Sequence, residues 1–272
     1  MGTKAVLFDL DDTLLWDERS VKDAFEATCV YAAEKVPGIT PDQLEAEVRR
    51  EARALYESYE TFPFTKMIGI NPFEALWATF SGGEHESFRK LQQLAPGYRM
   101  EAWTRGLRAV GVEHPEELGA ELAERFPQER RARPLAYEET FEVLDELKGR
   151  YKLLLLTNGA PDLQQEKIAG LPQLAGYFDH ILISGDFGEG KPSPAIFHKA
   201  IQLLDILPEE GIMVGDKLTT DILGSSKIGM PNVWINAHGA TSAGADALPT
   251  YEITRLRELL AILQDRKDKE PK

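Results

Sequence analysis

Two aspartates that could do chemistry, Asp9 and Asp11, follow a short apolar run at residues 5–8. Side chains two residues apart in an extended chain point to the same side, so both carboxylates can face one reacting atom. Close carboxylates repel each other, and a hard cation such as Mg²⁺ relieves that repulsion because it binds oxygen ligands. The pair therefore indicates chemistry beside a metal ion.

Two more aspartates, Asp216 and Asp221, follow another apolar run at residues 212–214. A single aspartate in a loop is usually a helix cap or a turn residue. Four of them at the ends of expected strands weaken that interpretation and favour a magnesium site. The expected metal ligands are Asp9, Asp11, Asp216 and Asp221.

Lys191, Thr157 and Asn158 could bind a phosphate group. Lys191 lies in a turn that two prolines stiffen, and Thr157 and Asn158 follow the apolar run at residues 153–156. A lysine in such a turn is often only a surface residue, and Thr157 and Asn158 could merely end a strand. The residues alone leave these interpretations open.

Five short, continuously apolar runs are expected to be strands, at residues 5–8, 153–156, 180–183, 212–214 and 233–235. Continuous apolarity is what a parallel sheet covered on both faces requires. Polar or small residues follow every run, and ligands bind where the carboxyl ends of parallel strands meet. The sequence therefore predicts an α/β fold with a Rossmann-like, doubly wound parallel sheet, with helices at residues 138–147 and 194–204.

The interval between the first two runs is too long for one crossover and contains helical patterns without a convincing strand. Ser20, with Asp23 three residues later, resembles a capping box, while Thr40 and Asn71, each followed by proline, are typical helix starts. An inserted all-helical domain is the economical interpretation. The expected domains are an α/β core at residues 1–15 and 131–272 and a helical cap at residues 16–130.

The composition argues against some classes of partner. A formal net charge of −14 disfavours nucleic acid, whose phosphates require clustered cations. The basic run of Arg130, Arg131 and Arg133 is typical of a helix end or a domain junction. Cys29 is the only cysteine, which favours the cytoplasm, and no apolar run approaches the ~20 residues of a membrane span.

Four ordered motifs resemble those of the haloacid dehalogenase-like hydrolase superfamily: Asp9-Leu10-Asp11-Asp12-Thr13-Leu14, Thr157, Lys191 and Gly215-Asp216-(four residues)-Asp221. The resemblance spans the core from end to end, and the helical insertion resembles the family's C1-type cap. It implies a magnesium-dependent phosphatase that acts on a small phosphorylated metabolite.

The resemblance implies catalytic roles for four residues. Asp9 would attack phosphorus to form an aspartyl-phosphate, and Asp11 would protonate the leaving alcohol and later deprotonate the attacking water. Thr157 would hydrogen-bond the transferring phosphoryl group, and Lys191 would neutralise its charge. Asn158 is expected beside them in the substrate site.

The resemblance also implies the metal shell. Asp216 would bind Mg²⁺ together with Asp9 and the carbonyl of Asp11, and Asp221 would support that shell or the lysine. Lys217 stands where many relatives carry a small polar residue, and its role is left open.

Three alternatives lie within the same fold. Haloacid dehalogenases lack the second aspartate of the first motif and need no metal, so Asp11 counts against dehalogenation. Phosphomutase-type relatives retain that aspartate, and only their products separate them from phosphatases. A non-catalytic scaffold would be expected to have lost some motif residues, and all are present.

In this family the cap selects the leaving group, so the resemblance of the core motifs implies the reaction and not the substrate. The chain is similar to the acylneuraminate phosphatase and pyrimidine nucleotidase branch and to bacterial hydrolases proposed as phosphoserine phosphatases. Candidate substrates are therefore phosphoserine, a nucleoside monophosphate and a sugar phosphate. Arg19, Lys66 and His85 could contact the leaving group, although solvated surface is the simpler interpretation.

Overall fold

A computed structural model describes residues 2–268 of the chain. The chain forms two compact units, an α/β unit of Met1–Asp17, Ala136–Gly159 and Leu171–Lys272, and a helical unit of Glu18–Leu135 and Ala160–Gly170. The sequence placed residues 160–170 in the core, and the structure groups them with the helical unit instead.

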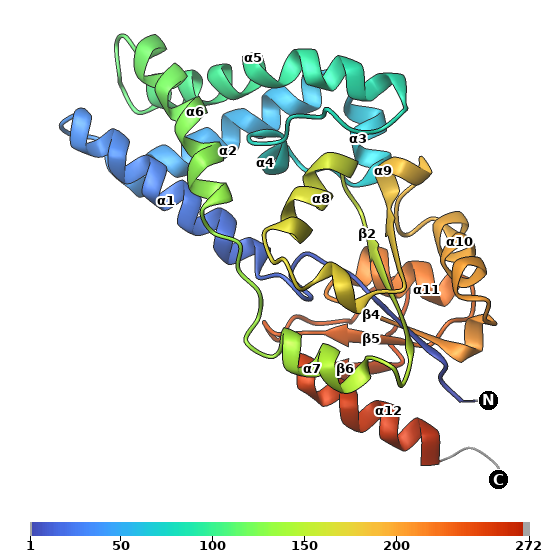
Figure 1. Cartoon of the computed structure of the whole chain (residues 1–272). Coiled ribbons are helices and arrows are strands. Elements are labelled where there is room, and N and C mark those ends of the chain that lie inside the picture. The colour runs from blue at the N-terminus through green and yellow to red at the C-terminus, as the bar shows by residue number, and fades with distance from the viewer. Residues whose placement is uncertain (1, 269–272) are drawn as a thin grey trace. The chain divides into compact units, whose positions relative to one another are not determined.

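A six-stranded parallel sheet forms the centre of the α/β unit, in the order β3-β2-β1-β4-β5-β6 (Figure 1). The strands are β1 (Ala5–Phe8), β2 (Lys152–Thr157), β3 (His180–Ile183), β4 (Gly211–Gly215), β5 (Asn232–Ile235) and β6 (Tyr251–Ile253). The five predicted strands are present, which confirms the α/β class. The short edge strand β6 was missed because three residues with one fully buried side chain form no apolar run.

The strand order of the sheet reverses between β1 and β4. The chain runs outward from β1 through β2 to β3 and then returns to place β4 on the other side of β1. The order continues from β1 toward β3 on one side and from β4 toward β6 on the other. Doubly wound sheets bind ligands at the carboxyl ends of the strands, where the order reverses in this way. Phe8 is in register with Val214, and the next backbone N–H, of Asp9, donates to the Val214 carbonyl at 2.9 Å.

Helices cover the sheet on both faces, as the continuously apolar strands predicted. Ala5 and Leu7 of β1 belong to one cluster with Phe197 of α10, whereas Val6 and Phe8 alternate to the opposite face and are equally buried. The helices of this unit are α7 (Thr140–Leu147), α9 (Ser184–Phe187), α10 (Pro194–Leu204), α11 (Leu223–Lys227) and α12 (Leu259–Asp268).

The helical unit has its own aromatic core. Phe25 packs against Trp103 and Phe126, with ring centroids 5.8 and 4.5 Å away, and Cys29 is buried in the same cluster. The helices are α1 (Asp17–Lys35), α2 (Pro41–Ser58), α3 (Phe62–Ile68), α4 (Pro72–Ala75), α5 (Glu86–Ala109), α6 (Glu116–Arg131) and α8 (Pro161–Ala169). Within residues 2–268, no helix combines the length and apolarity that crossing a bilayer requires.

Two of the three predicted helix starts are confirmed. The Thr40 hydroxyl accepts from the Gln43 N–H at the start of α2, and Asn71 forms a capping box with Glu74. Ser20 is not a cap, because α1 already begins at Asp17. Its hydroxyl instead donates to the Arg133 carbonyl at 2.5 Å and accepts from the Arg130 guanidinium at 2.7 Å.

The helix that begins after Asn71 is short, although the apolar residues Phe73, Leu76, Trp77 and Phe80 follow a helical spacing. It ends at Ala75, and Trp77 and Ala78 are buried in irregular structure. Arg131 donates to the Trp77 carbonyl and Arg99 donates to the Ala78 carbonyl, so both carbonyls have side-chain partners instead of a helical N–H. Tertiary contacts have therefore overridden the local helical pattern.

Helix α8 is tied to the helical unit by a buried ion pair. The Lys167 amine lies 2.8 Å from Glu74 Oε1, and the side chains are only 1% and 5% exposed. The other carboxylate oxygen of Glu74 accepts from the Asn71 N–H. A buried pair of this kind holds its two elements together because separating it would leave an uncompensated charge. This contact explains why α8 groups with residues 18–135.

Removing one partner of this pair is expected to destabilise the protein. Lys167→Ala should lower the free energy of unfolding in urea by about 3 kcal/mol, because the Glu74 charge stays buried. Lys35→Ala is the control, since Lys35 lies 2.7 Å from Glu121 with both side chains at least 40% exposed. The loss of stability in Lys35→Ala should be much smaller, because solvent screens an exposed ion pair. Equal losses in the two variants would contradict this role for the buried pair.

Candidate active site

The loop after β1 presents the first aspartate at the sheet edge. Asp9 is 6% exposed, and the Thr13 hydroxyl donates to its Oδ2 at 3.3 Å. The backbone then turns tightly, with the N–H groups of Leu14 and Leu15 both donating to the Leu10 carbonyl. Asp12 has φ of 60°, a left-handed conformation that aspartate tolerates better than most residues. The turn brings Thr13 back toward Asp9.

Lys191 lies between two carboxylates. Its amine is 2.5 Å from Asp9 Oδ1 and 2.7 Å from Asp221 Oδ1, and all three side chains are less than 10% exposed. Residues far apart in the sequence thus meet at the carboxyl edge of the sheet, as their positions after the strands predicted. Lys191 is not the solvated surface residue that its sequence context also allowed.

Charge compensation keeps this buried group ionised. Burial lowers the pKa of Lys191, but the carboxylates of Asp221 and Asp9 outweigh it and raise the pKa above its ordinary value. Burial raises the pKa of Asp9 to about 6, although Lys191 pulls it down. Asp9 is therefore a carboxylate at neutral pH, the form that a nucleophile requires.

Asp216 has the character of a metal ligand. Its Oδ1 is buried and has no hydrogen-bond partner within residues 2–268, while its backbone carbonyl accepts from Trp234 Nε1 at 2.8 Å. Burial raises the pKa of Asp216 to about 8. Carboxylate oxygens of Asp9, Asp216 and Asp221 lie within 4.8 Å of one another. This donor set fits a hard divalent cation such as Mg²⁺.

Asp221 is placed by a local distortion of the backbone. It lies on a π-helical turn, Leu218–Ile222, of the kind that often marks functional sites. Its Oδ2 accepts from the Lys217 N–H at 3.1 Å. A Cβ atom on Gly215 would come within 2.4 Å of the Asp221 carboxyl group, so this approach requires glycine. Lys217 thus contributes to the site through its backbone.

Both polar atoms of the Asn158 side chain are hydrogen-bonded to the Lys191 backbone. Its Nδ2 donates to the Lys191 carbonyl at 2.9 Å, and its Oδ1 accepts from the Lys191 N–H at 2.8 Å. Thr157, which ends β2, is 1% exposed and precedes this residue at the same sheet edge. The structure therefore brings Thr157, Asn158 and Lys191 together, with the Asn158 amide directed at the lysine backbone.

Two further residues of this edge, Thr13 and Ser184, make contacts that the sequence did not predict. Thr13 was part of the first motif, and its contact with Asp9 could have been suspected from that position. Ser184 follows β3, and its hydroxyl accepts from the Gly159 N–H at 2.9 Å. Nothing in the sequence around Ser184 predicts this contact, because it depends on how two loops meet.

The three residues considered for leaving-group contact belong to the helical unit, and two of them have local partners. Arg19 pairs with Asp23 at 2.7 Å. His85 accepts from the Ser87 N–H at the start of α5 and stacks on Phe64 with ring centroids 4.2 Å apart. Lys66 lies on the exposed surface of α3. The basic run ends α6, where Arg131 pairs with Glu166, as a helix-end interpretation predicted.

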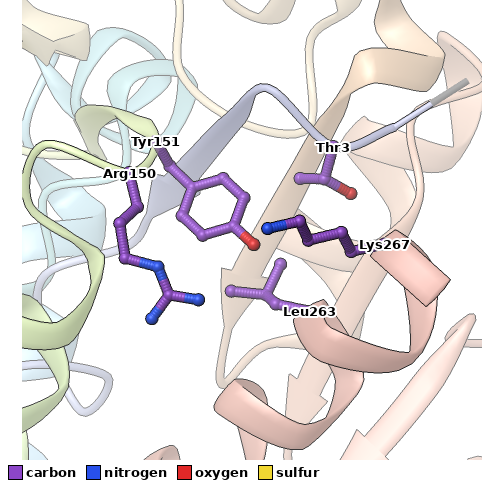
Figure 2. Close-up of a pocket in the computed structure, with 5 residues that line it drawn as sticks. All are labelled: Thr3, Arg150, Tyr151, Leu263 and Lys267. Carbon is purple, nitrogen blue, oxygen red and sulfur yellow. The ribbon is translucent and has the colours of Figure 1, made fainter.

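A separate hollow lies at the opposite edge of the sheet. Figure 2 shows its lining of Thr3, Arg150, Tyr151, Leu263 and Lys267, and its volume is about 280 Å³. Thr3 precedes β1 and Tyr151 precedes β2, so this hollow faces the amino ends of the strands. It contains none of the motif residues and is distinct from the candidate site.

Comparison with known families agrees with this arrangement. The family model of haloacid dehalogenase-like hydrolases matches residues 3–229, most of the chain. The chain belongs to this family. The match includes every motif residue described above, and the family is one of hydrolases.

Phosphatases are among its similar relatives. The hydrolase is 37% identical over 257 residues to a phosphoserine phosphatase of Thermus thermophilus, covering 94% of this chain and 97% of the relative. It is 40% identical over 128 residues to the N-acylneuraminate-9-phosphatase of Rattus norvegicus, covering 47% of this chain but only 51% of that relative. These relatives support a phosphoric monoester hydrolase.

Solved structures agree on the fold. The putative hydrolase YfnB of Bacillus subtilis, whose structure was determined with bound magnesium, is 22% identical and superposes with a TM-score of 0.66 over 97% of this chain and 99% of its own. At this identity the likeness concerns architecture alone.

The raised pKa values of Asp9 and Asp216 predict how stability depends on pH and metal. Between the ordinary aspartate pKa and about 8, the native protein holds protons that the unfolded chain has lost. Without metal, stability should therefore fall as pH rises through this window. A cation binds the deprotonated site, so excess Mg²⁺ should raise the melting temperature more at pH about 8.5 than at pH about 5.

Thermal unfolding in EDTA and in excess Mg²⁺ at the two pH values checks this expectation. Asp216→Asn, which cannot lose a proton, should show a smaller magnesium shift at the higher pH. A magnesium shift that is the same at both pH values would contradict protonation of the site.

Proposed function

We propose that this hydrolase is a Mg²⁺-dependent phosphatase that hydrolyses a small phosphomonoester through an aspartyl-phosphate on Asp9. The observation that carries the proposal is the buried Asp9–Lys191 pair at 2.5 Å beside Asp216, whose Oδ1 has no partner within residues 2–268. A buried cation next to an ionised nucleophile suits a phosphoryl group, since its oxygens carry negative charge throughout the reaction.

In the first step an Asp9 carboxylate oxygen attacks phosphorus. The new P–O bond forms as the bond to the leaving alcohol breaks, and Asp11 gives its proton to the leaving oxygen. The Lys191 ammonium and the Thr157 hydroxyl balance the charge on the phosphoryl oxygens. Thr13, which donates to Asp9 Oδ2, holds the carboxylate in a fixed orientation.

In the second step water attacks the phosphorus of the aspartyl-phosphate. Asp11, now a carboxylate, takes a proton from this water, and the P–O bond to Asp9 breaks. Inorganic phosphate leaves, and both aspartates regain their starting protonation states. One group thus serves as acid and then as base, so the reaction consumes only water.

Asp9, Asp216 and the carbonyl of Asp11 would hold the metal. A bound Mg²⁺ supplies positive charge that neutralises the phosphoryl oxygens and lets two neighbouring carboxylates stay ionised. Asp221 has protein partners on both oxygens, Lys191 and the Lys217 N–H. In this proposal Asp221 mainly holds the Lys191 ammonium in place, and it contributes less to metal binding.

The three alternatives share this fold. A phosphomutase would share the aspartyl-phosphate but pass the phosphoryl group to a second hydroxyl instead of water. Dehalogenation needs no acid–base residue at position 11, and Asp11 is present. A non-catalytic scaffold would not need the buried Asp9–Lys191–Asp221 cluster. The phosphatase-named relatives favour hydrolysis among these options.

The candidate substrates are phosphoserine, a sugar phosphate and a nucleoside monophosphate. The name of the Thermus relative, which matches over nearly its full length, supports phosphoserine first, and the Rattus relative supports a phosphorylated sugar acid. We propose no nucleic acid or membrane partner, because the net charge of −14 repels phosphate polymers and anionic surfaces.

The mechanism predicts that phosphate release depends on Asp9 and on metal. Purified protein with Mg²⁺ should release phosphate from a generic aryl phosphate, and EDTA should stop the reaction. Asp9→Asn should lower kcat by at least about 1,000-fold, because the amide cannot attack phosphorus. Circular dichroism and the melting temperature check that the variant is folded. Full activity in Asp9→Asn, or activity that EDTA leaves unchanged, would sink the mechanism.

The proposed hydrolysis also predicts the products. With phosphoserine, sugar phosphates and nucleoside monophosphates as substrates, each released alcohol should appear with one equivalent of inorganic phosphate. The ranking of kcat/KM across the panel identifies the substrate class, because specificity is differential binding of transition states. Phosphorus NMR that shows transfer to another hydroxyl, with little free phosphate, would favour the mutase instead.

A further inference from the structure

The Asn158 side chain makes a reciprocal contact with the backbone of the buried lysine. One amide accepts from the Lys191 N–H at 2.8 Å and donates to the Lys191 carbonyl at 2.9 Å. Both backbone polar groups of this residue are thereby fixed by a single side chain. The contact joins the loop after β2 to the turn that carries the lysine, 33 residues later.

The turn has no spare room around this amide. A Cβ atom on Gly190 would lie 2.8 Å from Asn158 Oδ1 and 3.0 Å from its Cγ and Nδ2, and these are its three nearest neighbours. Gly190 does not adopt a left-handed φ, so its lack of a side chain serves the approach of Asn158 rather than the backbone angle. The pair Gly190 and Asn158 therefore forms a fitted contact.

The loop that carries Asn158 is itself anchored. The Gly159 N–H donates to Ser184 Oγ at 2.9 Å, and the Gly159 carbonyl accepts from the Gly185 N–H at 3.1 Å. These contacts connect the ends of β2 and β3. The Asn158 amide thus connects the ends of β2 and β3 to the Lys191 backbone through hydrogen bonds.

We propose that Asn158 is a positioning residue, which acts by holding the Lys191 backbone so that the ammonium stays between Asp9 and Asp221. The inference rests on the proposed function, because it concerns the lysine that faces the phosphoryl group. It replaces the role that the sequence suggested, in which Asn158 contacts substrate. A long lysine side chain has several rotatable bonds, so a fixed backbone confines the ammonium to one place.

A positioning role and a substrate-contacting role for Asn158 predict different changes in activity when the leaving group is varied. A residue that acts through Lys191 affects the phosphoryl group, which is common to all substrates and to inorganic phosphate. A residue that contacts the leaving group affects substrates unequally and leaves the binding of inorganic phosphate unchanged. The variants Asn158→Ala and Gly190→Ala separate a positioning role from a substrate-contacting role. Asn158→Ala removes the amide, whereas Gly190→Ala removes no polar group and only displaces the Asn158 amide.

The kinetic test compares both single variants and the double variant. Each single variant should lower kcat/KM by about 10- to 100-fold, by the same factor for two aryl phosphates with different leaving groups. Inhibition by inorganic phosphate should weaken in parallel. The double variant should resemble Asn158→Ala alone, because the shortened side chain leaves space for the Cβ at position 190.

A readout that needs no activity accompanies the kinetics. Hydrogen exchange at the Lys191 N–H, followed by mass spectrometry of the peptide that contains it, should accelerate in both single variants. If the wild-type protein releases no phosphate, the proposed function fails, and hydrogen exchange still tests the contact between Asn158 and Lys191.

Asn236 provides a matched control. Its amide makes the same reciprocal pair, donating to the Ala240 carbonyl at 2.9 Å and accepting from the Ala240 N–H at 2.7 Å, in a loop after β5. Asn236→Ala should lower the melting temperature to a similar degree while changing kcat/KM less than about 3-fold. Its peptide exchange should accelerate near position 240 and not at Lys191.

Two outcomes would overturn the inference. The first is a loss of activity in Asn158→Ala that differs between leaving groups, with unchanged phosphate inhibition and unchanged exchange at Lys191. The second is an equal loss of activity in Asn236→Ala, which would mean that any broken strand-end amide contact lowers catalysis through stability alone.

Discussion

A buried ammonium between two buried carboxylates is the interaction around which the candidate site of the α/β unit is arranged. Lys191 lies 2.5 Å from Asp9 and 2.7 Å from Asp221, and removing these groups from water is costly for folding. A hydrophobic cluster of the same volume would be as stable or more so. The polar cluster is therefore better explained by a catalytic role than by stability. In that role the Lys191 ammonium orients the Asp9 carboxylate and binds an anionic substrate.

The parallel sheet makes this cluster possible with little distortion. Asp9 follows β1, Asp216 follows β4, and the two strands are neighbours where the order of the sheet reverses. Lys191 comes from a turn beyond β3, and its backbone is held from the end of β2 through Asn158. Two close approaches complete the arrangement: Gly215 admits the Asp221 carboxyl group, and Gly190 admits the Asn158 amide.

Much of the fold and of the candidate site was predictable because strand ends have a simple geometry. Short apolar runs predicted five of six strands. Polar residues directly after those runs pointed to Asp9, Thr157 and Asp216, and the turn stiffened by two prolines pointed to Lys191. Features that arise from tertiary contacts were not predictable. Ser20 resembles a cap but bonds Arg133, and the helix after Asn71 stops at Ala75, where arginine side chains bond the next carbonyls. The buried Lys167–Glu74 pair, which assigns α8 to the helical unit, joins positions 93 residues apart.

If Asp9 is the nucleophile, it becomes phosphorylated during turnover, and mass spectrometry can detect that phosphoryl group. The protein is mixed with Mg²⁺ and a substrate that it turns over, quenched in acid, digested, and the peptide that contains Asp9 is examined for an added phosphoryl group. This added mass should appear on Asp9 during turnover and be absent from Asp9→Asn. Robust turnover with no phosphoryl group on Asp9, or the same modification on another residue, would contradict it.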